Sequence, residues 1–126
     1  MDSNDLTYKI RGAIFTVFNE LGPGLLESVY EAALMYELKE IGLNVKNQVV
    51  VPINYKNVQL ENGFRIDILV ENEIILEIKS VELLQNVHKK QLLTYLKLTG
   101  LTLGLLINFN CERLISKENL IRIINS

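Results

Sequence analysis

The stretch that decides the fold is FRIDILVENEIILEIK, residues 64–79. Apolar residues alternate with other residues on both sides of the polar segment 71–73, which is typical of two β-strands joined by a short loop. Successive side chains of a strand point to opposite faces of its sheet. The alternation therefore predicts one wholly apolar face, made up of Phe64, Ile66, Ile68 and Val70 from the first strand and Ile74, Leu76 and Ile78 from the second.

The opposite face of this predicted hairpin carries charges in the middle of both strands. If residues 71–73 form the loop, Val70 pairs with Ile74. Counting back along both strands then brings Asp67 directly across from Glu77, with their Cβ atoms about 5 Å apart. Two facing carboxylates repel each other unless a cation lies between them, and Mg²⁺ takes carboxylate oxygens as ligands. Lys79 projects from the same face and can reach the same point.

The flanking sequence predicts helices on both sides of these strands. From Asp5 to Leu21 the apolar residues recur at steps of three and four, as in an amphipathic helix, and Gly22-Pro23-Gly24 ends the pattern. A second helical pattern runs to about Ile41, and a third runs from Leu84 to Thr99 and stops at Gly100.

Further segments rich in Val and Ile predict more strands, at Val45–Tyr55, Val58–Leu60 and Leu103–Phe109. Asn62-Gly63 is the strongest short-range hairpin signal in the chain. The segment from Arg113 to Ile124 fits neither pattern clearly. The order of elements predicts an α/β sandwich, with helices flanking a mixed central sheet.

Composition limits the class of protein. The 126 residues suit one domain, residues 1–126, with a core of its own. A net charge of −2 excludes a protein that coats nucleic acid with its whole surface, but it permits a local basic cleft. A single cysteine excludes an internal disulfide and a four-cysteine zinc site. The chain offers neither a secretory signal nor an apolar run long enough for a membrane helix, so we expect a cytoplasmic protein with no membrane partner.

Spacing alone leaves two interpretations of the charged hairpin face open. Arg65, Asp67, Glu77 and Lys79 could form salt bridges on a solvated surface, which contribute little to stability. Alternatively, the two acids could form a metal site. The predicted helices favour the second interpretation, because a sandwich covers both sheet faces and partly buried charges are costly unless a site uses them.

Three motifs carry a resemblance to a known family over nearly the whole chain. Residues 24–30, GLLESVY, resemble the signature of the GxxExxY proteins. Asp67 followed by Glu77-Ile78-Lys79 resembles the D…ExK core of the PD-(D/E)xK nuclease superfamily, and HxxQLxxY follows at residues 88–95. One departure is that Ile66 stands where the superfamily's name has proline. The resemblance implies a restriction-endonuclease-like α/β/α sandwich that hydrolyses phosphodiester bonds with Mg²⁺.

The resemblance also implies roles for individual residues. Asp67 and Glu77 would hold the metal, Mg²⁺ or alternatively Mn²⁺, with the main-chain carbonyl of Ile78 as a further ligand. Glu27 would approach from the second helix as another ligand, directly or through water. Lys79 would orient the attacking water or stabilise charge on the phosphate. Glu27 also has a plain structural explanation, since acids are favoured in the first turn of a helix.

The third predicted helix supplies the expected nucleic-acid contacts. Gln91 and Tyr95 lie four residues apart on one helical face and would brace the site or touch the nucleic-acid backbone. Lys89 and Lys90 would add positive charge beside them. The expected partner is nucleic acid, with DNA favoured over RNA. Tyr95 also fits a simple packing role, and His88 fits a surface position.

Two other functions remain open at the level of the sequence. The first is a non-catalytic module that keeps the nuclease-like fold and forms a homodimer or docks on a partner. Its interface would be the helix face around Leu34, Met35 and Tyr36, or the run 101–106. The second is metal-assisted hydrolysis of a small phosphorylated ligand, which a narrow enclosed cleft would favour.

Overall fold

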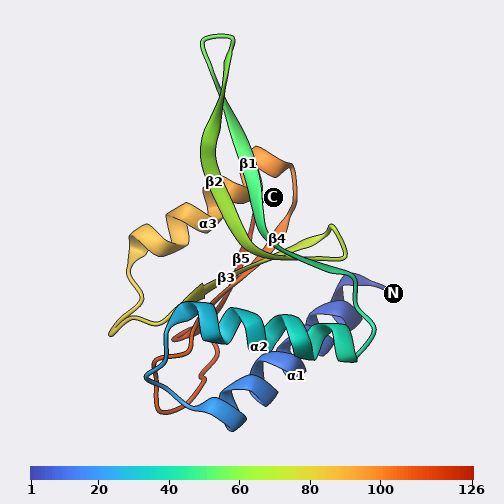
Figure 1. Cartoon of the computed structure of the whole chain (residues 1–126), viewed down its shortest axis with the longest axis vertical. Helices are drawn as coiled ribbons and strands as arrows, with labels where there is room; N and C mark the ends of the chain where they lie inside the picture. The colour runs from blue at the N-terminus through green and yellow to red at the C-terminus, as the bar shows by residue number, and fades with distance from the viewer.

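The computed structural model describes the backbone of residues 1–126 and the side chains of all residues except residue 62. The strands form a sheet in the order β1-β2-β3-β4-β5, in which β3 and β4 are parallel and the other neighbours are antiparallel. This mixed sheet with flanking helices confirms the predicted α/β sandwich (Figure 1). Along the chain the elements are α1 (Ser3–Leu21), α2 (Glu27–Glu40), β1 (Val45–Tyr55), β2 (Val58–Val70), β3 (Ile74–Lys79), α3 (Asn86–Thr99), β4 (Leu103–Asn108) and β5 (Leu120–Ile124).

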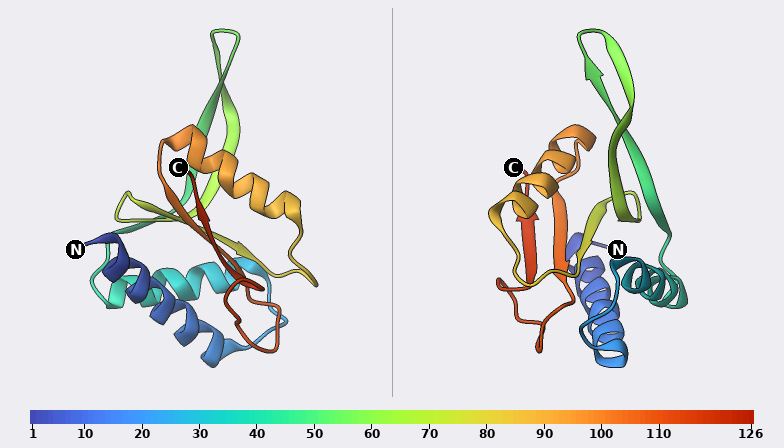
Figure 2. Two further views of the ribbon diagram at one scale, coloured as in Figure 1. Left: turned by 180° about the vertical axis from the view of Figure 1, so that it is seen from behind. Right: turned by 60° about the vertical axis from the view of Figure 1, so that its left-hand side comes forward.

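Helices cover both faces of the sheet. α1 and α2 lie side by side on one face and α3 lies on the other, as the three views show (Figures 1 and 2). β3 divides its side chains between the two resulting cores. Ile74, Leu76 and Ile78 share one face, as predicted, and pack with α1 and α2, whereas Ile75 packs with Leu92 of α3. The strict alternation of β3 therefore directs Glu77 toward the α3 side of the sheet.

The helix ends follow local capping. α1 begins earlier than predicted because the Asp2 side chain accepts a hydrogen bond from the Asp5 N–H and caps the helix. α3 begins at a capping box in which His88 Nδ1 accepts a hydrogen bond from the Gln85 N–H. His88 is therefore half-buried at a helix cap.

Among the residues that the structure describes, no helix is both long enough and apolar enough to cross a membrane.

The turn between β1 and β2 lies at Lys56-Asn57, so the prediction of a hairpin turn at Asn62-Gly63 is wrong. Lys56 and Asn57 have φ of 48° and 68°, and positive φ at both central residues is typical of the type I′ hairpin turn. β2 runs on through Asn62 and Gly63, which joins the two predicted strands at Val58–Leu60 and Phe64–Val70 into one. The side chain of Asn62 lies outside the described residues.

Gly63 lies at a β-bulge and not in a turn. The strand register changes there, since Val51 pairs with Phe64 whereas Ile53 pairs with Leu60. Pro52, which lies between Val51 and Ile53, has no N–H to donate a hydrogen bond to β2. A Cβ at residue 63 would lie 2.1 Å from the Val51 carbonyl oxygen, so this close approach of two backbones requires glycine.

The β1–β2 ribbon crosses from one core to the other near its middle. Ile68 and Val70 pack against α1 and α2, but Phe64 and Ile66 pack against α3, so the prediction that all four share one face is wrong. The crossing coincides with Gln48, which has φ of 51°. Two-stranded ribbons twist strongly, and this one extends well beyond the rest of the sheet (Figure 1).

Candidate active site

Asp67 and Glu77 meet where β2 and β3 separate. The predicted register is confirmed, with Val70 opposite Ile74 and Ile68 opposite Leu76. Within the described backbone, the pairing of β2 with β3 ends at Ile68 and Leu76. Beyond that pair, the two carboxylates accept hydrogen bonds from the main chain of the opposite strand. The Asp67 N–H donates to Glu77 Oε1 over 3.1 Å, and the Ile78 N–H donates to Asp67 Oδ2 over 2.7 Å. The acids therefore converge on a gap inside the sheet.

Burial determines the ionisation of this pair. Glu77 is only 4% exposed, and its burial together with the charge of Asp67 raises the pKa of Glu77 to about 9. Burial also raises the pKa of Asp67, against the opposing effect of the Ile78 hydrogen bond. The two carboxyl groups lie within hydrogen-bonding reach of each other. At neutral pH and without a cation, the pair therefore retains a proton.

Lys79 lies close enough to act on both acids. Its ammonium charge lowers the pKa of Asp67 and of Glu77, although burial prevails in both cases. The side chain is half-buried at the end of β3. The structure thus brings together the three charged residues of the predicted D…ExK core.

Glu27 joins the end of β3 from the first turn of α2. Its Oε2 accepts a hydrogen bond of 2.9 Å from the Ser80 N–H, directly after β3. The Ser80 hydroxyl donates to the Leu25 carbonyl over 2.7 Å and reinforces the same contact. Tyr30 holds the loop between α1 and α2 in place. Its buried hydroxyl donates a hydrogen bond to the Gly22 carbonyl, and its ring stacks on that of Phe109. Gly22–Tyr30 is therefore held as a unit against the site.

A cleft of about 430 Å³ opens between α2 and the sheet beside these residues. It includes Glu31, which was not among the site residues expected from the sequence. Gln48 Nε2 donates to Glu31 Oε1 over 2.7 Å, and the Glu31 charge contributes to the raised pKa of Asp67. Glu31 lies one helical turn after Glu27, so the four-residue spacing was a signal available in the sequence. The cleft is lined by Glu27, Ser28, Glu31, Gln48, Asp67 and Ile78.

On the α3 side, Tyr95 lies next to the acid pair. Burial and the charges of Glu77 and Asp67 raise the pKa of Tyr95 to about 12, and its ring packs 4.8 Å from that of Phe64. Gln91 is half-buried one turn earlier on the same helix. The predicted basic residues lie elsewhere: Lys90 is exposed, and Lys89 lines a different cleft, at the β5 edge of the sheet.

The donor atoms at the acid pair fit a hard divalent cation in part. Within the described residues, no group of three or more His, Cys, Asp or Glu side chains is arranged to hold a metal ion. The main chain can add a further oxygen ligand to the two carboxylates, because the N–H and C=O groups of one strand residue point to the same side of the strand. The Ile78 carbonyl thus faces the side on which its N–H contacts Asp67. Two carboxylates and a carbonyl are the oxygen donors that Mg²⁺ takes, together with water.

The fold and the acid pair define a nuclease-like α/β protein, and the family comparison agrees. Residues 4–123 match the family model described as PD-(D/E)XK nuclease superfamily. The match covers almost the entire chain, so this chain belongs to the PD-(D/E)XK nuclease superfamily. The comparisons with curated proteins and with solved structures give no match.

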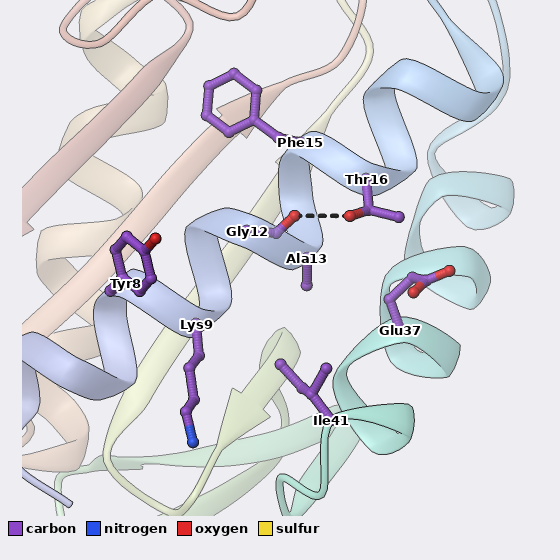
Figure 3. Close-up of a pocket in the computed structure, with 8 residues that line it drawn as sticks. All are labelled: Tyr8, Lys9, Gly12, Ala13, Phe15, Thr16, Glu37 and Ile41. Carbon is purple, nitrogen blue, oxygen red and sulfur yellow. Dashed lines mark hydrogen bonds between the residues drawn. The ribbon is translucent and has the colours of Figure 1, made fainter.

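Another cleft, of about 490 Å³, lies between α1 and α2. Figure 3 shows Lys9 and Ile41 directed into the gap between the two helices. Glu37 is the acidic residue among its described lining side chains, and Lys9 offers a compensating charge. This arrangement has no pair of converging acids, so it does not compete with the β2–β3 site as a metal centre.

Proposed function

We propose that this protein is a metal-dependent nuclease that hydrolyses phosphodiester bonds of DNA at the Asp67–Glu77 pair. The observation that carries the proposal is the convergence of the buried Glu77 and the half-buried Asp67 in the gap between β2 and β3. Superfamily membership supports a nucleic-acid substrate. DNA is the substrate that we propose first, and RNA is the comparison.

The charge of the cleft argues for a required cation. Glu27, Glu31 and Asp67 line it, and Glu77 lies beside it, so a phosphodiester would be repelled unless a cation neutralised these acids. Asp67, Glu77 and the Ile78 carbonyl would hold Mg²⁺ or Mn²⁺, and Glu27 would contribute directly or through water. When bound, the metal acts as a Lewis acid that lowers the pKa of a water molecule and stabilises charge on the phosphate.

The remaining residues would position the reacting groups. The Lys79 ammonium lies beside the acids and would stabilise the negative charge that develops on the phosphate. A tyrosine is protonated at physiological pH, and burial with the nearby acids raises the pKa of Tyr95 further, to about 12, so Tyr95 would serve as a hydrogen-bond donor and not as a base. Gln91, on the same helix, would orient the nucleic-acid backbone. The GxxExxY resemblance of residues 24–30 stays a prediction.

The test compares cleavage by two variants that each lose one carboxylate. Plasmid DNA, single-stranded DNA and RNA are incubated with Mg²⁺ or Mn²⁺ and with the wild type, Glu77→Gln or Glu73→Gln. We expect Glu77→Gln to reduce the rate about 100-fold or more, since it removes a metal ligand. Glu73→Gln, in the exposed loop of the same hairpin, should retain the wild-type rate. Equal rates for Glu77→Gln and the wild type would contradict the proposal, as would the absence of cleavage under every condition.

A further inference from the structure

A basic groove of about 490 Å³ runs along the β5 edge of the sheet. Its cationic side chains come from segments far apart in the sequence: Arg11 from α1, Lys89 from α3, Lys117 from the loop before β5, and Arg122 from β5 itself. Figure 2 shows β5 passing between α1 and α3 at this edge. We use the name basic groove for these four residues and the surface between them.

The charge of the basic groove differs from that of the whole molecule. The chain has a net charge of −2, yet the described residues that line this groove include four cations and no carboxylate. Cations gathered in this way repel one another, and their combined potential attracts anions. Ordinary packing does not require such a cluster on an acidic protein, so the cluster points to an anionic ligand.

Part of the basic groove is held in place. Arg11 Nη2 lies 3.5 Å from the Ser116 hydroxyl oxygen, to which it donates. The Lys117 N–H donates to the Leu120 carbonyl over 3.0 Å, which anchors the loop to the start of β5. Arg11 and Lys89 are half-buried, whereas Lys117 and Arg122 are exposed. Arg11 and Lys89 thus lie on the inner side of the groove, and Lys117 and Arg122 form its exposed rim.

The sheet register relates the basic groove to the acid pair. Glu77 pairs with Leu106, and Leu106 pairs with Ile121, a wall residue of the groove. The groove therefore lies level with Glu77 and two strand spacings away, which is about 10 Å across the sheet. Because α3 packs on β4 between the two places, a nucleic-acid strand with one phosphate at the acid pair would pass around this helix to bring a neighbouring stretch of its backbone to the β5 edge.

We propose that the basic groove binds the phosphate backbone of a nucleic-acid strand as a second contact surface. The four cations come from four segments around one cleft, and two of them are exposed at its rim, so they can contact more than one phosphate of a polymer at a time. The assignment of that strand as the substrate rests on the proposed function, but its binding to the groove does not require cleavage.

The test measures binding without catalysis. A fluorescein-labelled single-stranded 20-nucleotide DNA is titrated with protein in EDTA, and its anisotropy gives the dissociation constant at several salt concentrations. The variant Lys89→Gln/Lys117→Gln/Arg122→Gln is compared with the control Lys9→Gln/Lys39→Gln/Lys46→Gln, whose lysines are exposed on α1, α2 and β1. Each removes three positive charges and takes the net charge from −2 to −5.

We expect the groove variant to bind at least about 10-fold more weakly and the control to stay within about twofold of the wild type. The slope of log K against log salt should become shallower by about 2 in the groove variant alone, at about 0.7 per phosphate contact for single strands. Thermal unfolding of both variants verifies that they fold, and Arg122→Lys, which keeps the charge, should bind as the wild type does.

Three results would overturn the inference. The first is unchanged binding by the groove variant, and the second is equal weakening in the control, which would assign the effect to net charge. The third is complete displacement of the DNA by millimolar inorganic phosphate, which would indicate a site for a single phosphate. Because the assay needs neither metal nor cleavage, its outcome is separate from that of the Glu77→Gln cleavage assay.

Discussion

Glu77 is an acid whose surroundings favour its neutral form, and this has a direct consequence for stability. Its pKa is about 9 in the folded chain against 4.5 for an unperturbed glutamate. Between these values the folded chain binds more protons than the unfolded chain. Stability rises with pH only where the unfolded state binds more protons, so here it must fall as pH rises. The raised pKa of Asp67 acts in the same direction.

We therefore predict that the free energy of unfolding of the protein in EDTA decreases from pH 5 to pH 9. Urea unfolding at a series of pH values measures it. Glu77→Gln should flatten this dependence because the amide does not titrate, whereas Glu73→Gln should keep it. Added Mg²⁺ should stabilise the wild type most at the alkaline end, where the ligands are deprotonated. A wild-type stability that does not change with pH would contradict the buried, proton-sharing pair.

At the scale of elements, the position of α3 depends on a close contact with β4. Gly104 of β4 lies directly beneath Leu92, which is fully buried. A Cβ at residue 104 would lie 2.8 Å from Leu92 Cδ1, so the helix that carries Tyr95 rests almost on the strand backbone. The absence of a side chain at residue 104 thus allows α3 to pack this closely on β4.

We predict that Gly104→Ala lowers the free energy of unfolding by about 1–3 kcal/mol, because it overpacks this contact. Urea denaturation measures the change. Gly12→Ala is the matched control, since a Cβ at that position in α1 has open space around it. The control should be neutral or stabilising by up to about 1 kcal/mol, as expected for alanine in place of glycine in a helix. Equal effects of the two substitutions would show that α3 adjusts freely.

The β2–β3 hairpin was predictable and the β1–β2 hairpin was not, for physical reasons. In β2–β3 a short polar loop and strict alternation determine the register, which is how Asp67 and Glu77 could be brought together from the sequence. In β1–β2 the positive φ of Gln48 and the bulge at Gly63 change the face and the register. Local propensity does not reveal these features, because the packing of the ribbon against both cores imposes them.

At the scale of the whole molecule, charge is separated across the sheet in a way that a net charge of −2 conceals. The acidic cleft beside β2 contains Glu31, which tertiary packing brings to Asp67 from 36 residues away in the chain. The basic groove at β5 gathers residues from four segments. The individual D…ExK residues could be found from local patterns. The acidic cleft and the basic groove both form from segments that are far apart in the sequence. They therefore depend on tertiary packing, which the spacing of residues along the chain does not reveal.

The central claim is that Asp67 and Glu77 hold a divalent cation, and anomalous diffraction from crystals soaked in Mn²⁺ tests it most directly. We predict an anomalous peak within about 2.0–2.3 Å of carboxylate oxygens of both residues, at about the distance found for hard divalent cations. The peak should be absent from Glu77→Gln crystals treated in the same way. Strong Mn²⁺ peaks elsewhere on the protein, with none between these two carboxylates, would contradict the account.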